Sequence, residues 1–437
     1  MPTKQSTQIS IMSSIFQTTP TNEPYNSPTP GQISIVAGRA NADPNGMTDE
    51  YCKTMADCGF NAATAHLGDA YTKETLANCA KNGISLFLSN ANLTKYTSSY
   101  IKPYKNLEGL GGWILSFNML PYGIKQIIEK YKVNKEINEA DDQKHPVFVG
   151  VSGDWNYDSD HEIIRSYPEY VEGIEYGFSP TFWPVFYFPD LTPLSGDSNE
   201  EEERQLMYYK TLQYFAYVSQ FTNVPFWFSI RCQAFNSIYG LKGDIPNERL
   251  MRGLVFTALA YGSQGLYYWN YRQNGPSGNT TYSNAPVDIN GNKTETWDIV
   301  KAINDEVKAF NDVFCGCEML DCRHKSGRKN TQSLKPFENA MGPLIDITCS
   351  GYEVNVIVSH IWNNEKNYLV VVFNPFGSPF YGSDKPIIIR PVTLKFSEYW
   401  KVYRLQKQNA GYREVELVDY DYSHLPYQGD YLIFRWE

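Results

Sequence analysis

The 437-residue chain carries 38 Lys and Arg against 48 Asp and Glu, a net charge of -10 that lacks the basic footprint of nucleic-acid-binding proteins. With 42% hydrophobic and 20% charged residues it is not a largely disordered chain, and no apolar run approaches the roughly 20 residues of a membrane span. Aromatic residues reach 15%, including 33 Tyr and 9 Trp, which favours a surface that meets flat amphipathic ligands such as sugars.

Residues 1–31 are rich in Ser, Thr, Asn and Pro, which is typical of a flexible tail outside the fold. Their only basic residue is Lys4 and they have no unbroken apolar segment, so they do not form a secretory signal. Because a polar tail ahead of a sugar-binding domain is typical of exported proteins, we expect a secreted, periplasmic or cell-surface protein whose leader is absent from this sequence. A cytoplasmic location is the alternative.

Residues 32–312 alternate short β-rich runs with capped helical stretches. The pattern predicts eight strands, at 33–37, 61–66, 84–88, 111–115, 147–151, 174–178, 225–230 and 265–269. It predicts helices at 49–59 with Thr48 as N-cap, and at 72–83, 122–131, 160–170, 200–220, 246–261 and 296–310. About eight β/α units in some 280 residues predict a closed (β/α)8 TIM barrel. A doubly wound sheet is the alternative, but the turn at Gly38 has no dinucleotide fingerprint.

Residues 313–437 lose the helical periodicity. Strands are predicted at 352–358, 367–373, 385–389, 400–405 and 431–434, separated by short turns. This pattern indicates a small all-β sandwich domain after the barrel.

The eight cysteines are scattered, apart from a run that brings Cys315, Cys317 and Cys322 close to His324. Three thiolates and an imidazole could bind zinc, but the usual C-x-x-C spacing is missing. We therefore expect no metal, and either buried thiols or one disulfide. No phosphate-binding loop, H-E-x-x-H or G-x-S-x-G motif is present, so no cofactor is expected.

Side chains suited to sugar recognition follow the predicted strands at their carboxyl ends, where barrel proteins place their sites. The candidate binding residues are Arg39, His66, Asn118, Met119, Trp155, Trp183, Arg231, Gln233, Trp269 and Tyr271. Indoles and phenols stack on sugar faces, whereas amides and guanidinium groups hydrogen-bond to hydroxyls. The convergence of these types, more than any single residue, predicts a carbohydrate site, with an oligosaccharide or polysaccharide as the partner.

The segments 111–115, 225–228 and 252–269 resemble bacterial glycoside-hydrolase barrels of clan A, with family 42 beta-galactosidases and their uncharacterised relatives the nearest. The segments 369–375 and 429–434 are similar to the β-sandwich that follows such barrels. The resemblance covers about residues 31–437. It implies a general acid after strand four and a nucleophile at the end of strand seven.

The catalytic pattern of that family is not matched. Asn118 aligns with the family's Asn or Asp, and Met119 then stands where the acidic Glu belongs. A thioether cannot donate a proton to a leaving oxygen. The end of strand seven, 229–233, has no carboxylate, so the pair required at about 5–5.5 Å for retention or 6.5–9.5 Å for inversion cannot come from strands four and seven.

The remaining candidate catalytic pair is Glu175 and Asp154, expected on adjacent strands six and five. Glu175 could instead form a structural ion pair with Arg231 or Arg39. Asp154 could instead contact a ligand or cap a turn.

Three functions remain open at this point: a glycoside hydrolase with shifted carboxylates, a catalytically silent glycan-binding protein of a polysaccharide-uptake system, and a module whose rim aromatics contact another protein. The sequence selects no sugar, linkage or oligomeric state among them.

Overall fold

The structure is a computed structural model of the whole chain. It describes residues 29–40, 46–67, 69–89, 97–119, 133, 136–152, 182–187, 209, 212–213, 215–216, 219–220, 225–237, 242–243, 247–276, 280–326, 334–349, 355–373, 391–427 and 429–437. The expected tail, 1–31, lies outside these ranges except for its last residues, and the helices expected at 122–131 and 160–170 also lie outside them.

Eight parallel strands form a curled sheet. They are β1 (Ser34–Ala37), β2 (Ala62–His66), β3 (Ser85–Ser89), β4 (Leu110–Met119), β5 (Val147–Ser152), β6 (Phe182–Tyr187), β7 (Trp227–Arg231) and β10 (Gly265–Trp269). Their order, β1-β10-β7-β6-β5-β4-β3-β2, closes because β1 pairs with both β10 and β2. Two seams are narrow, since β6 and β7 share the single pair Val185–Trp227 and β1 pairs with β2 through two residues.

The sixth strand differs from the sequence prediction. The range 174–178 lies outside the described residues, and the sixth barrel strand is β6, Phe182–Tyr187. This run contains Pro184, which lacks an amide hydrogen and therefore argues against a central strand when only the sequence is considered. In the sheet Pro184 pairs in register with Val149 of β5.

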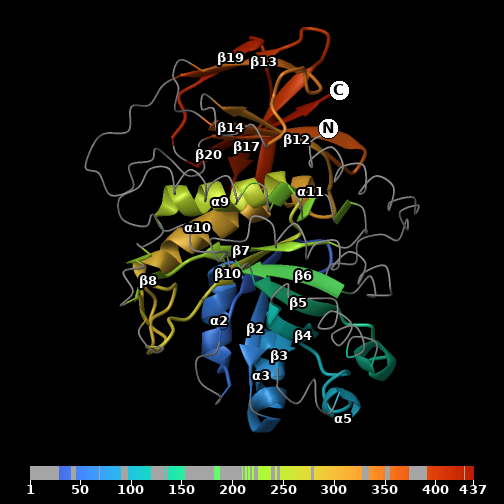
Figure 1. Cartoon of the computed structure of the whole chain (residues 1–437), viewed down its shortest axis with the longest axis vertical. Helices are drawn as coiled ribbons and strands as arrows, with labels where there is room; N and C mark the ends of the chain where they lie inside the picture. Colours follow the sequence, from blue (N-terminus) through green and yellow to red (C-terminus); the bar gives the residue numbers. More distant parts are fainter. Residues whose placement is uncertain are drawn as a thin grey trace, which may run out of the picture.

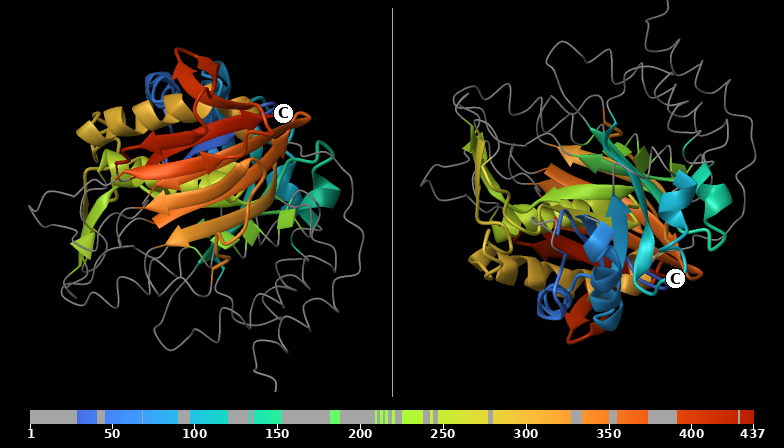
Figure 2. Two further views of the ribbon diagram at one scale, coloured as in Figure 1. Left: turned by 90° about the horizontal axis from the view of Figure 1, so that it is seen from above. Right: turned by 90° about the horizontal axis from the view of Figure 1, so that it is seen from below.

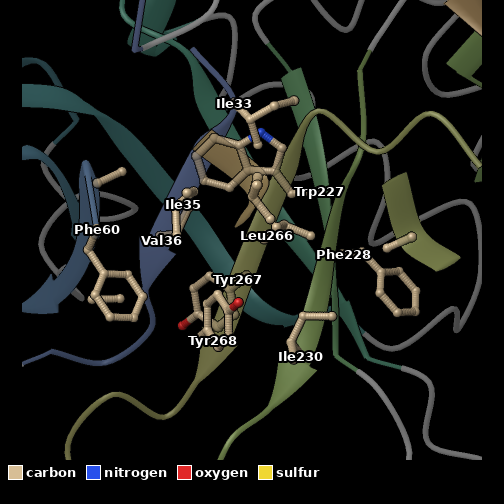
Figure 3. Close-up of a cluster of buried hydrophobic side chains, with 14 of the residues drawn as sticks. Ile33, Ile35, Val36, Phe60, Trp227, Phe228, Ile230, Leu266, Tyr267 and Tyr268 are labelled. Atoms are coloured by element: carbon tan, nitrogen blue, oxygen red, sulfur yellow. The ribbon is translucent and has the colours of Figure 1, made fainter. Parts of the chain in front are cut away.

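Aromatic side chains fill the barrel interior. Phe87 packs edge-to-face on Phe148 and on Trp227, with ring centroids 4.7 and 5.4 Å apart, and Phe148 and Trp227 lie 4.1 Å apart. Gly265 makes room for this cluster, because a Cβ there would lie 2.4 Å from the Trp227 ring. Figure 3 shows Trp227 beside Leu266, with the buried side chains of β1, β7 and β10 side by side.

The described helices are α2 (Asp49–Asp57), α3 (Asp69–Lys81), α5 (Thr97–Ile101), α9 (Glu248–Ala260), α10 (Glu295–Ala309) and α11 (Asn311–Phe314). The predicted Thr48 cap is confirmed, since its hydroxyl accepts a 3.2 Å hydrogen bond from the Tyr51 amide. Asn247 caps α9 through a 2.8 Å bond from the Leu250 amide. The parallel sheet of the predicted barrel is present, and the full ring of eight helices stays a prediction.

Antiparallel sheets make up the C-terminal part, as predicted. The six-stranded sheet consists of β12 (Glu318–Ser326), β14 (Asn355–Asn363), β15 (Lys366–Phe373), β20 (Asp430–Trp436), β17 (Val402–Gln408) and β18 (Gly411–Glu416), in that spatial order. The three-stranded sheet consists of β13 (Leu344–Cys349), β16 (Val392–Phe396) and β19 (Asp421–His424). Apolar residues of both sheets, among them Leu344, Val371 and Phe434, share one buried core. The strand expected at 385–389 lies outside the described residues.

Helices α9 and α10 lie between the barrel and the six-stranded sheet (Figure 1). Helix α9 contacts β7 on one side and β14, β15 and β20 on the other, which explains why it is apolar around most of its circumference. Phe256 of α9 stacks on Tyr431 of β20 with centroids 3.4 Å apart. The strands of the six-stranded sheet run across the molecule when it is seen from above (Figure 2).

Candidate functional site at the carboxyl ends of the barrel strands

The carboxyl ends of the parallel strands bring His66, Arg231 and Trp269 to the same end of the barrel. Arg231 ends β7 and pairs in register with Trp269, the last residue of β10. His66 ends β2 and pairs with Ser89 of β3. Side chains alternate along a strand, so Arg231 shares the inward face of Trp227, four residues earlier.

Two hydroxyl groups inside the barrel, those of Thr64 and Tyr267, lie in contact near the ends of β2 and β10. The Thr64 hydroxyl accepts a 2.9 Å hydrogen bond from the Arg39 amide and lies 3.2 Å from the Tyr267 hydroxyl. Gly38 is required here, because a Cβ would lie 2.6 Å from the Tyr267 ring and from the Tyr268 carbonyl oxygen. Arg39 follows in the left-handed region with φ 44°, and its side chain is exposed.

Backbone hydrogen bonds join the turns that follow β1, β7 and β10. The Tyr271 amide donates to the Gly38 carbonyl at 2.9 Å, and the Cys232 amide donates to the Trp269 carbonyl at 3.2 Å. The peptide between Trp269 and Asn270 is cis. The two hydrogen bonds join the turn after β10 to the turns after β1 and β7.

A small antiparallel sheet stands beside Trp269. It consists of β8 (Ala234–Ser237), β9 (Lys242–Gly243) and β11 (Thr280–Ser283), in the order β11-β8-β9. Tyr282 of β11 faces the partly exposed Trp269 ring edge-on at 6.5 Å. The sequence prediction missed Tyr282 and Thr64, because their roles depend on pairing between distant strands.

Tyr271 lies in the core and contributes no surface to the barrel mouth. It is fully buried, with its ring edge-on to Phe60 at 5.1 Å and to Tyr51 at 5.9 Å. Burial raises the pKa of its hydroxyl. The sequence prediction placed this residue at the surface because the turn that packs it behind β10 was not recognisable.

Two buried amide side chains follow the carboxyl ends of neighbouring strands at this end of the barrel. Gln233 follows β7, Asn270 follows β10, and both side chains are fully buried. Within the described part of the chain, neither amide has a hydrogen-bond partner for its nitrogen or oxygen. Gln233 was predicted as a binding residue, and it stands in this structure as a buried amide. Asn270, which directly follows Trp269, was not among the predicted binding residues.

Some predicted site residues lie at positions that differ from the prediction, and others lie outside the described residues. Trp183 is the second residue of β6 and pairs with Phe148, so it lies toward the amino end of that strand, while Tyr187 ends it. The reason is that the sixth strand lies later in the sequence than predicted.

Asn118 and Met119 end β4, where the Met119 backbone pairs with Val151. The residues whose placement the structure does not describe are Asp154, Trp155 and Glu175.

The shifted strand also removes the argument that paired Glu175 with Asp154. In the sequence Glu175 comes before β6 and Asp154 comes after β5, and the placement of both residues lies outside the described part of the chain. None of the residues that end the eight barrel strands is Asp or Glu.

No group of three His, Cys, Asp or Glu side chains that could hold a metal occurs among the described residues. Cys315, Cys317 and Cys322 are free thiols, and the Gln264 amide donates to the Cys317 sulfur at 3.5 Å. His324 is instead hydrogen-bonded to the Tyr261 hydroxyl at 2.5 Å.

No family model and no curated protein matches the chain. Among solved structures it is similar to the beta-galactosidase of the psychrophilic Marinomonas ef1, with a TM-score of 0.49 and 9% identity over 63% of this chain and 60% of that one. The beta-galactosidase of Rahnella sp. R3 gives a TM-score of 0.48 and 10% identity over 68% of this chain and 59% of that one. The Ruminococcus gnavus beta-glucuronidase gives a TM-score of 0.41 and 15% identity over 59% of this chain and 46% of that one.

The chain therefore spans about three fifths of the two beta-galactosidases. The strand order and register given above define the barrel. In the part of the chain that the structure describes, no helix is both long and apolar enough to cross a membrane.

Proposed function

We propose that the carboxyl end of the barrel binds a carbohydrate, and that the protein is a glycan-binding relative of barrel glycosidases. The observation that carries this proposal is the register pair Arg231–Trp269 with His66 on the same inward end. An indole stacks on the apolar face of a sugar ring, and the guanidinium and imidazole donate to its hydroxyls.

Binding is favoured over hydrolysis because none of the eight residues that end the described barrel strands is Asp or Glu. Retaining and inverting glycosidases both need two carboxyl groups at a defined separation. At the two positions that would supply them, β4 ends in Met119 and β7 ends in Arg231. A glycosidase that uses Asp154 and another acid is the competing function, and the experiment below includes it as an outcome.

A glycan array tests the proposal, combined with an assay of nitrophenol release from a panel of aryl glycosides. We expect binding to at least one class of polysaccharide fragment and no release above the rate without protein. Turnover that is abolished in Asp154→Asn would show a hydrolase instead. The absence of binding to every glycan would contradict the proposal.

A further inference from the structure

Two buried thiols meet between the first two helices of the barrel. Cys52 lies in α2 and Cys79 in α3, both are fully buried, and their Sγ atoms are 3.7 Å apart. Helices α2 and α3 pack side by side on the outside of the sheet (Figure 1). A disulfide requires the sulfurs to approach to about 2.0 Å, so the two side chains need to close by roughly 1.7 Å.

Polar contacts tie the start of α2 to the end of α3, next to the two thiols. The Asn82 amide, just after α3, donates to the Asp49 carboxylate of α2 at 2.8 Å, and Lys81 forms an ion pair with the same carboxylate. The Asn78 amide of α3 donates to the Met47 carbonyl, just before α2, at 2.9 Å. The helices therefore keep the two sulfurs facing each other.

The other described cysteines lack such a partner. The Cys58 thiol donates to the Trp297 carbonyl at 3.4 Å, and the Cys232 thiol donates to the Asn270 carbonyl at 3.1 Å. Within the described residues, Cys52 and Cys79 are the one pair in which each thiol has a sulfur as its hydrogen-bond partner.

We propose that Cys52 and Cys79 are a dithiol that closes to a disulfide in an oxidising compartment and thereby cross-links α2 to α3. A small-molecule disulfide of the glutathione type is the oxidant. The Cys52 thiolate attacks it to form a mixed disulfide and releases one glutathione thiolate. The Cys79 thiolate then attacks the Cys52 sulfur and releases the second. The two protein thiols are oxidised, two glutathione thiols are formed, and the protons of the protein thiols pass to them.

The two thiols differ in acidity, and this difference gives the order of the two steps. The hydrogen bond between them lowers the pKa of the Cys52 thiol, whereas that same contact and burial raise the pKa of Cys79. Cys52 is therefore the first nucleophile and Cys79 the resolving thiol. The cross-link joins residues 27 apart, a loop length at which a disulfide restricts the unfolded chain appreciably.

The experiment uses the full-length protein in oxidised glutathione, both incubated in the folded state and refolded from denaturant. Free thiols are alkylated under denaturing conditions, and the digest is analysed by mass spectrometry without reduction. We expect a peptide that links Cys52 to Cys79, a mass lower by two hydrogens, and a melting temperature several degrees higher that returns to its starting value with dithiothreitol.

The Cys52→Ser and Cys79→Ser variants should lose the mass change and the reversible rise in melting temperature. Cys315→Ser, at a half-exposed thiol outside the pair, should keep both. If Cys52 and Cys79 stay fully alkylated after both the folded and the refolded treatment, or pair with other cysteines, the proposal is overturned.

Discussion

Gly38 shows how a single residue positions the candidate site. Its amide donates to the Tyr268 carbonyl at 2.9 Å and its carbonyl accepts from Tyr271, so it joins the last barrel strand to the first. The missing side chain allows the Tyr267 ring to reach Thr64. Sequence reasoning recognised the turn after the first strand but not this close approach, which depends on two strands far apart in the chain.

Gly38→Ala is expected to destabilise the protein by roughly 1–3 kcal/mol and to weaken glycan binding, because the new Cβ must displace an aromatic ring and a backbone carbonyl. The free energy of unfolding from urea titration measures the effect. Gly411→Ala is the matched control, since a Cβ there meets no atom within 4 Å. Equal stability of the two variants would contradict this account of Gly38.

His324 predicts how stability depends on pH. Its ring is buried against Tyr209 at 4.8 Å, and burial lowers its pKa to about 3. Because the pKa is lower in the folded than in the unfolded chain, its contribution to stability is complete above about pH 6.5 and is lost as the pH falls toward 3.

Between pH 7 and pH 4.5 the wild type should therefore lose roughly 2–3 kcal/mol more unfolding free energy than His324→Gln. His360→Gln, at a half-buried histidine in β14, serves as the control and should follow the wild type. A parallel pH dependence of wild type and His324→Gln would contradict the assignment.

At the scale of elements, local signals predicted best the segments that have their own caps and apolar faces. The expected helices at 49–59, 246–261 and 296–310 correspond to α2, α9 and α10 to within a few residues, since Thr48, Asn247 and Thr294 cap them. Strand β6 was misplaced because its Pro184 and dense aromatics do not follow a local strand pattern. Pairing with β5 and β7 determines its position, and this position places Trp183 away from the carboxyl end of the barrel.

The cap of α9 provides a test at this scale. Asn247→Ala should cost about 1 kcal/mol of unfolding free energy, because the Leu250 amide loses its acceptor. Asn247→Asp keeps an oxygen acceptor and should remain near wild type in the same chemical denaturation experiment. A loss in the Asp variant as large as in the Ala variant would exclude the capping role.

For the whole molecule, α9 joins the barrel to the C-terminal sheets, because it is buried on both sides. Two parts that share a buried helix are expected to unfold as one cooperative unit. The sequence predicted the change from barrel to strands near residue 313, but not that α9 would be the shared element, since burial on two sides arises only when the parts meet.

Calorimetry should accordingly show a single unfolding transition. Phe256→Ala should lower the unfolding free energy by roughly 3–5 kcal/mol, because the stack on Tyr431 is lost. The midpoint temperature of the transition should fall with it. Two separate transitions in the wild type would show that the parts unfold independently.

The most direct test of the carbohydrate site is a calorimetric titration of the best glycan from the array into wild type, Trp269→Ala and Trp400→Ala. Trp269 ends β10 at the barrel mouth, whereas Trp400 is an exposed tryptophan in the turn before β17 of the C-terminal part. A stacked ring contributes roughly 0.5–1.5 kcal/mol beyond area burial, so Trp269→Ala should bind about 2- to 10-fold more weakly or worse, and Trp400→Ala as tightly as wild type. Unchanged affinity in Trp269→Ala, or loss in Trp400→Ala alone, would contradict the placement of the site at the carboxyl end of the barrel.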